Sequence, residues 1–208
     1  MADKLKVAVL LSGRGSNMLA LSEHKRRDPD RPYEIALVAS NVPEARGLVL
    51  ARRLGHPTWS LSHKGLERQE FDLKLDEALR AREIDLIALA GYMRLLSDDF
   101  VERWAGRILN VHPSLLPLYK GLDTHRRAIV SGDEYAGCSV HLVTADLDSG
   151  PVLGQAKVKI LPRDDSESLA ARVLEEEHRL YPIVLEQYCR ALIDDAALAH
   201  QPEGQDES

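Results

Sequence analysis

The 208-residue sequence contains six short apolar runs that read as continuous stretches rather than as alternating apolar and polar residues. Such runs are typical of strands buried on both faces of a parallel sheet. They lie at Lys6–Ser12, Glu34–Ala39, Ile84–Ala90, Arg107–Val111, Ser139–Val143 and Ala156–Ile160.

Segments with helical spacing separate the early runs. They cover Asn17–Arg27, Glu44–Leu54 and Leu66–Arg82, and the last of them places its apolar residues roughly on one side. Strand and helix therefore alternate from residue 6 to about residue 110. This order predicts an α/β fold with an open, mostly parallel sheet and right-handed crossovers.

The pattern changes after residue 130. Only a Gly150-Pro151 turn separates the last two apolar runs, which leaves no room for a crossover helix and predicts an antiparallel strand pair. A long helix, about Ser166–Ile193, is expected to close the fold, with Pro182 kinking it or splitting it near Tyr181. We predict one domain over residues 1–193 and a frayed or disordered acidic tail over 194–208.

The charge distribution restricts the possible ligands. The formal net charge is −6, and residues 194–208 supply −5 of it, so the rest of the chain is nearly neutral. Nucleic-acid binders need Lys and Arg clusters to neutralise phosphates, and no such run occurs, so we expect no nucleic-acid partner. A small anionic ligand held by local donors remains compatible with a nearly neutral body.

The sequence pattern predicts neither a membrane span nor an export signal. No stretch approaches the roughly 20 apolar residues of a membrane span, and the first apolar run passes into glycines rather than into a cleavage site. Cys138 and Cys189 lie far apart with no CxxC motif, which argues against a disulfide framework and a zinc knuckle. We expect a soluble, cytoplasmic protein without a membrane partner.

A glycine loop, Ser12–Asn17, follows the first run and opens the first helix. Its glycines permit close approach of a ligand, and free N–H groups at a helix start favour an anion. Met18 replaces the third glycine of a dinucleotide fingerprint, and the lysine of a P-loop is absent. Two interpretations remain: a site for a terminal phosphate, or a tight turn capped by Ser16.

The segment Asn110–Pro117 ends a predicted inner strand, where open α/β sheets bind ligands. Asn110 and His112 point to the same side of that strand, about 7 Å apart along the backbone. Such a pair can stabilise an oxyanion, and a protonated imidazole needs a nearby carboxylate, for which Asp146 and Asp148 are candidates.

Each of these residues also has a structural interpretation. Asn110 can cap a turn, His112 can be a core histidine with its hydrogen bonds satisfied, and Asp148 can be an ordinary turn former. A metal site of His112, His125 and His141 is disfavoured because no spacing resembles HExxH. A serine hydrolase built on Ser114 lacks the GxSxG elbow.

Five motifs occur in a collinear order from about Lys6 to Pro182. They are SGRGSN after the first run, AGYMRLLS at Ala90–Ser97, NVHPSLLP at Asn110–Pro117, GLDTHRRA at Gly121–Ala128 and SVHLVTADLDSGPVLGQ at Ser139–Gln155. Together they resemble the phosphoribosylglycinamide formyltransferase family of purine synthesis. The resemblance implies a Rossmann-like formyltransferase fold. It also implies formyl transfer from the co-substrate 10-formyltetrahydrofolate to the amine of 5-phosphoribosylglycinamide, without a metal.

The resemblance also implies roles for individual residues. Asn110 and His112 would stabilise the oxyanion, and Asp148 would keep His112 protonated and help to move a proton through ordered water. The implied ribonucleotide-binding residues are Gly13, Arg14, Gly15, Ser16, Asn17 and Glu177. The implied folate-binding residues are Arg68, Met93, Arg94, Leu95 and Leu96, together with Asn110. On sequence alone, the MRLL segment can instead be a core strand end and Arg68 a solvated helix charge.

The loop Gly121–His125 departs from the family pattern. Relatives often carry His or Asn where this chain has Asp123, and a negative charge there is expected to disfavour a phosphate, so His125 can be a loop anchor rather than a catalyst. The resemblance also suggests a cis bond at Leu116-Pro117, since X-Pro bonds tolerate cis best.

Three other functions share part of these motifs. A formyltetrahydrofolate hydrolase is the nearest, but such relatives usually carry an additional N-terminal domain. A methionyl-tRNA formyltransferase adds a C-terminal RNA-binding domain. An inactive folate or nucleotide binder is expected to lose one of Asn110, His112 and Asp148, and all are present. We expect small-molecule partners and a monomer or homodimer.

Overall fold

The computed structural model describes residues 4–199, and side chains up to residue 198. The strands are β1 (Leu5–Leu11), β2 (Tyr33–Ser40), β3 (Thr58–Ser60), β4 (Leu86–Leu89), β5 (Ile108–His112), β6 (Tyr135–Leu142) and β7 (Val152–Lys159). The helices are α1 (Ser16–Arg27), α2 (Arg46–Arg53), α3 (Arg68–Arg80), α4 (Asp98–Arg103), α5 (Thr124–Ser131) and α6 (Ser166–Ala199). All seven strands form one sheet in the order β3-β2-β1-β4-β5-β6-β7.

The predicted sheet is confirmed. β3, β2, β1, β4 and β5 pair in parallel, and β6 and β7 pair antiparallel with each other. β6 also pairs antiparallel with β5, so the change of direction comes one strand earlier than the predicted pair. The sequence pattern missed β3, α4 and α5, because these elements have only three, six and eight residues and show no sustained period.

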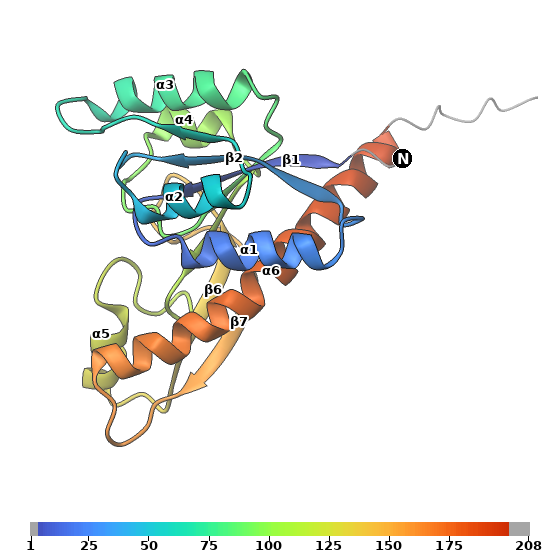
Figure 1. The fold of residues 1–208 in the computed structure, drawn as a ribbon. Coiled ribbons are helices and arrows are strands. Elements are labelled where there is room, and N and C mark those ends of the chain that lie inside the picture. The colour runs from blue at the N-terminus through green and yellow to red at the C-terminus, as the bar shows by residue number, and fades with distance from the viewer. Residues whose placement is uncertain (1–3, 200–208) are drawn as a thin grey trace, which may run out of the picture.

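The side chains of β1 explain why this strand is apolar without alternation. Val7, Val9 and Leu11 belong to the core under α1, α2 and α6, whereas Ala8 and Leu10 belong to the core under α3 and α4. Figure 1 shows these two groups of helices on opposite sides of the sheet. A strand buried on both faces needs apolar side chains at every position.

Helix α6 differs from the prediction at two points. It continues through Pro182 without a break, so the predicted split near Tyr181 is wrong, and it ends at Ala199 rather than at Ile193. The Tyr181 side chain is fully buried, and its hydroxyl donates to the carbonyl oxygens of Leu89 and Leu109 at 3.1 and 3.2 Å. These contacts hold the helix where proline removes one backbone hydrogen bond. Residues 200–208 of the predicted tail lie outside the described residues.

A cluster of charges joins α6 to α1 and to the turn before β2. The Glu186 carboxylate is 14% exposed and accepts from His24 at 2.8 Å, from Arg190 at 2.7 Å and from Arg31. Burial acts to raise the pKa of Glu186, but the hydrogen bonds from Arg190 and His24 and the charge of Arg31 lower it to about 2.

We predict that Glu186→Gln destabilises the protein at neutral pH by about 2 kcal/mol. Because the folded-state pKa lies below the ordinary carboxyl value, the stabilisation is complete above about pH 4.5 and disappears as the pH falls toward about 2. Urea denaturation at pH 7, pH 4 and pH 2.5 measures the difference from the wild type. Glu176→Gln serves as the control, because the Glu176 carboxylate, which pairs with Arg179, is more exposed than the Glu186 carboxylate. If the difference in the free energy of unfolding stays constant with pH, the stabilisation does not come from the charge of Glu186.

Candidate active site

The carboxyl ends of β1 and β4 lie side by side at the point where the strand order reverses. β2 and β3 lie on one side of β1 in the sheet, and β4, which follows them in the chain, lies on the other side. Ser12, just after β1, donates its backbone N–H to the carbonyl oxygen of Gly91, just after β4, at 3.0 Å. Open α/β sheets bind their ligands in the crevice at such a reversal.

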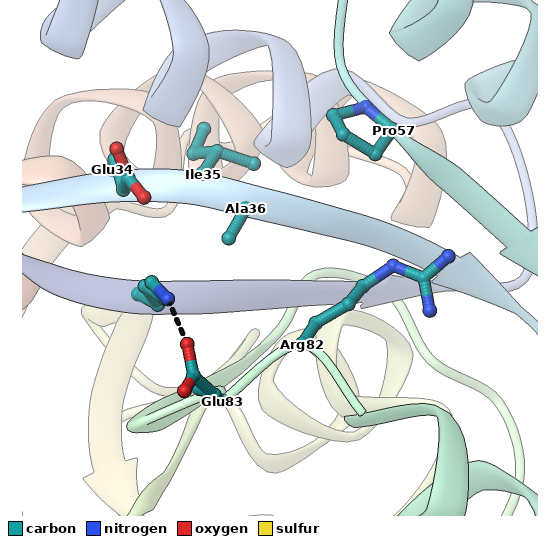
Figure 2. A pocket seen from close by; sticks show the side chains of 7 residues that line it. Glu34, Ile35, Ala36, Pro57, Arg82 and Glu83 are labelled. Atoms are coloured by element: carbon teal, nitrogen blue, oxygen red, sulfur yellow. Dashed lines mark hydrogen bonds and ion pairs between the residues drawn. The ribbon is translucent and has the colours of Figure 1, made fainter. Parts of the chain in front are cut away.

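A groove of about 490 Å³ lies at the opposite edge of the sheet. Figure 2 shows its lining at the amino-terminal ends of β1 and β2, where Lys6 pairs with Glu83 at 2.6 Å beside Glu34 and Arg82. None of the residues proposed from the sequence lines this groove. The candidate site is therefore at the carboxyl edge, where those residues gather.

The glycine loop packs against the start of α2. Gly15 has φ +80° and precedes α1 without a side-chain cap, so the interpretation of Ser16 as the helix cap is wrong. A Cβ on Gly15 would lie 2.6 Å from the Cα of Gly47, and the Gly47 N–H donates to the Gly13 carbonyl oxygen at 2.9 Å. This contact fixes the loop and leaves the Arg14 side chain exposed.

Asn17 in the loop meets Glu177 of α6, although 160 residues separate them in sequence. The Asn17 Nδ2 donates to Glu177 Oε2 at 2.7 Å, and both residues are 7% exposed. Burial raises the pKa of the Glu177 carboxyl, which outweighs the opposing effect of the Asn17 hydrogen bond. The buried Asn17 Oδ1 has no hydrogen-bond partner among the described residues. It is free to accept from a ligand hydroxyl.

The MRLL segment leaves β4 beside this loop. Met93 is 71% exposed and Leu95 is 54% exposed, whereas Leu96 packs partly against the core under α3 and α4. The Ser12 hydroxyl accepts from the backbone N–H of Met93 at 2.8 Å and donates to Asn41 Oδ1 at 2.6 Å. Ser12 thus ties the two predicted binding segments together, a link that the sequence did not predict.

The two predicted folate arginines lie close to each other. Arg94 stacks over the ring of Phe71 at 4.9 Å and donates to the carbonyl oxygen of Glu67 at 3.3 Å. Arg68 is exposed at the first position of α3. Burial raises the pKa of the Asp72 carboxyl, and both arginine charges oppose that rise, so both lie near this group. The structure therefore brings Arg68 close to Arg94 of the MRLL segment.

Asn110 and His112 occupy alternate positions on β5, so their side chains share a face, as predicted. Asp148 approaches from the loop after β6, with its Oδ2 3.3 Å from His112 Nδ1 and 2.9 Å from the Gly121 N–H that donates to it. His112 Nε2 lies 3.0 Å from the carbonyl oxygen of Tyr119. Both ring nitrogens thus face oxygen acceptors, an arrangement that a doubly protonated imidazole satisfies.

Asp148 is the buried charge of this group, with a side chain only 7% exposed. Burial acts to raise the pKa of its carboxyl. Hydrogen bonding to its oxygens, including that from the Gly121 N–H, and the positive charge of His112 outweigh burial and lower that pKa. The carboxylate is therefore held in its charged form beside His112.

The structure also places the remaining predicted residues. Asp123 has a largely exposed carboxylate, 3.7 Å from Arg126, so its charge faces solvent. His125 has a buried Nε2 without a hydrogen-bond partner among the described residues, and burial together with the charge of His112 lowers its pKa. The Leu116-Pro117 bond is cis.

His141 belongs to the set of three histidines, with His112 and His125, for which the sequence disfavours a metal site. Within residues 4–198, no group of three or more His, Cys, Asp and Glu side chains is arranged to hold a metal ion. Instead, the ring of His141 lies between Asn110 at 3.2 Å and Asp148 at 3.6 Å. The pairing of β5 with β6 places it there, and a prediction of strand register could have found it. No helix of the described chain is long and apolar enough to cross a membrane.

Comparisons with known proteins agree with this geometry. Residues 5–185 match the family described as formyl transferase. Phosphoribosylglycinamide formyltransferase of Haemophilus influenzae is 42% identical over 184 residues, which cover 88% of this chain and 86% of that protein. The trifunctional purine biosynthetic protein adenosine-3 of Drosophila melanogaster is 43% identical over 182 residues, but the chain spans only 14% of that protein.

A solved structure shows the same fold. The crystal structure of phosphoribosylglycinamide formyltransferase from Brucella melitensis superposes with a TM-score of 0.85 and is 46% identical, covering 90% of this chain and 96% of that one. With the family match extending from β1 into α6, and with relatives of similar length at this level of identity, the chain belongs to the formyl transferase family.

Proposed function

We propose that this protein transfers the formyl group of 10-formyltetrahydrofolate to the amine of 5-phosphoribosylglycinamide in purine biosynthesis. The observation that carries the proposal is the convergence of Asn110, His112 and Asp148 at the carboxyl edge of the sheet. The Haemophilus influenzae and Brucella melitensis relatives, which are of similar length, are named for the same reaction and support the proposal. We also propose that the protein is cytoplasmic and works as a monomer or homodimer on small-molecule substrates.

The chemistry needs stabilisation of an oxyanion and transfer of one proton. The amine nitrogen attacks the formyl carbon, a C–N bond forms, and the carbonyl electron pair moves to oxygen. Asn110 Nδ2 donates a hydrogen bond to that oxygen, the positive charge of protonated His112 stabilises it, and the buried Asp148 carboxylate stabilises the charge on His112. When the C=O bond re-forms, the bond to the folate nitrogen breaks, and the proton lost by the amine passes to the folate nitrogen through ordered water near Asp148.

The two binding segments follow β1 and β4, the strands that precede β5 in the sheet order. The N–H groups of the Gly13–Asn17 loop, with Arg14, hold the phosphate at the start of α1. Glu177 and Asn17 contact the ribose, because their buried polar atoms lie at the base of that loop. The exposed side chains of Met93 and Leu95 cover the pteridine, while Arg68 and Arg94 face the glutamate tail.

We predict that the purified protein produces tetrahydrofolate from formyl folate only when 5-phosphoribosylglycinamide is present. A spectrophotometric assay of the folate product, run with and without the ribonucleotide, checks this dependence. Release of formate at the same rate without the ribonucleotide would assign the hydrolase activity instead.

His112→Ala is expected to lower kcat by about 10²–10³, because it removes the positive charge that is needed when negative charge develops on the formyl oxygen. Folate affinity, measured by fluorescence titration, should change little, since the ring of His112 is not among the residues that cover the pteridine. Activity within a few-fold of the wild type would exclude the assigned role.

Asn17→Ala is expected to raise the apparent KM for the ribonucleotide about tenfold or more and to change kcat less, because this side chain binds ground state and transition state alike. Ser16→Ala should act in the same direction with a smaller effect. Steady-state kinetics with each substrate varied separately makes the comparison. An equal rise in the KM for formyl folate would contradict a site specific for the ribonucleotide.

A further inference from the structure

His141 is buried beside the three proposed catalytic residues, and it has no role in the reaction proposed above. It is 1% exposed, and its Cα is the direct cross-strand partner of Asn110 in the antiparallel β5–β6 pair. Directly opposite residues of such a pair point to the same face of the sheet. We infer that His141 is a positioning residue that sets the orientation of the Asn110 carboxamide, an inference that rests on the proposed function.

The partners of the imidazole determine where its proton lies. His141 Nδ1 is 2.8 Å from the carbonyl oxygen of Leu142, which only accepts, so Nδ1 carries the hydrogen. In a neutral ring the other nitrogen, Nε2, is then an acceptor, and Asn110 Nδ2 lies 3.2 Å from it. The Leu142 carbonyl is itself fixed, since a Cβ on Gly150 would lie 1.9 Å from its oxygen.

An acceptor at this position selects one of the two carboxamide orientations. The amide nitrogen and oxygen of Asn110 have nearly the same shape, so packing alone does not distinguish them. The reversed orientation would place Asn110 Oδ1 against the lone pair of His141 Nε2, which is repulsive. In the selected orientation one Nδ2 hydrogen is held by His141, and the second remains available for the formyl oxygen.

Asp148 is a charged group that faces the ring. The Asp148 Oδ1 is 3.6 Å from His141 Nε2, beyond hydrogen-bond length, while Oδ2 faces His112 and accepts from the Gly121 N–H. A second proton on His141 would turn Nε2 into a donor, draw it toward Asp148 and reverse the Asn110 carboxamide. The productive state is therefore the neutral ring with its hydrogen on Nδ1.

Two substitutions separate the acceptor from the bulk of the ring. Gln at position 141 offers an amide oxygen near the position of Nε2, whereas Leu fills the space without an acceptor. We expect His141→Leu to lower kcat about 100-fold with the KM for both substrates within threefold, and His141→Gln to stay within about tenfold of the wild-type kcat. Equal losses for both variants, a kcat within threefold of the wild type for His141→Leu, or a loss seen mainly in KM would overturn the inference.

His56→Leu provides a matched control outside the site. His56 is a half-buried histidine whose Nε2 lies 2.6 Å from the Ser22 hydroxyl. Its replacement removes a histidine hydrogen bond of similar kind, and kcat should remain within twofold of the wild type. A loss equal to that of His141→Leu would show that removing any such histidine disturbs the fold, and it would overturn the assigned role.

A double-mutant cycle tests whether His141 acts through Asn110. Two residues that act as a unit show strongly non-additive effects. In an Asn110→Ala background, we expect His141→Leu to lower kcat by less than threefold further. A full further loss of about 100-fold would mean that His141 acts through Asp148 or through the fold, and the inference would fail.

Nitrogen NMR of the ligand-free wild-type protein tests the contact without turnover. At pH 7 we expect His141 to carry its hydrogen on Nδ1 and to show a hydrogen-bond coupling from Asn110 Nδ2 to Nε2. A hydrogen on Nε2 would overturn the inference even if the enzyme is active. Absence of ribonucleotide-dependent formyl transfer would instead refute the proposed function, and the NMR result would still decide the contact.

Discussion

Burial of β1 on both faces positions both ends of the candidate site. All residues from Val7 to Leu11 are fully buried, and each large side chain of this kind stabilises the fold by about 1.5–3 kcal/mol. Helices on either side of the sheet therefore hold the strand against sliding or tilting. Its carboxyl end can present Ser12 and the glycine loop at a fixed place, and Ser12 holds the MRLL segment through the N–H of Met93.

The buried carboxylate of Asp148 is the fixed group beside the proposed catalytic residues Asn110 and His112. A buried charge persists only when charges or donors surround it, and the protonated His112 side chain and the Gly121 N–H supply that environment. The loop that carries Asp148 is in turn held against the end of β6, where the approach of Gly150 to Leu142 leaves no space for a side chain. Backbone geometry and electrostatics thus define the same position for this carboxylate.

Much of this organisation could be predicted from local sequence patterns. Continuous apolar runs indicated every long strand, and the alternation of Asn110 and His112 on β5 placed two functional side chains on one face. β3, α4 and α5 have three, six and eight residues and show no sustained period, which explains their omission. The continuity of α6 through Pro182 depends on tertiary contacts of Tyr181, which a helix-breaking rule does not include.

Contacts between distant segments could not be predicted in the same way. The links from Ser12 to Asn41 and from Asn110 to His141 depend on strand order and on register, and neither is encoded in a local period. The family resemblance implied that Asn17 and Glu177 bind the same ribonucleotide, but their direct contact, across 160 residues of chain, was not predicted.

Two buried carboxylates of the site have pKa values that are shifted in opposite directions, and this contrast distinguishes their environments. Burial dominates at Glu177, which accepts a hydrogen bond from the neutral Asn17 side chain, and it raises the pKa of that carboxyl. At Asp148, cationic and hydrogen-bonding neighbours overcome burial and lower the pKa. Carboxylates separated in this way suit different tasks. Asp148 can balance a protonated imidazole during charge development, whereas Glu177, beside a neutral amide, suits the neutral hydroxyl groups of a sugar.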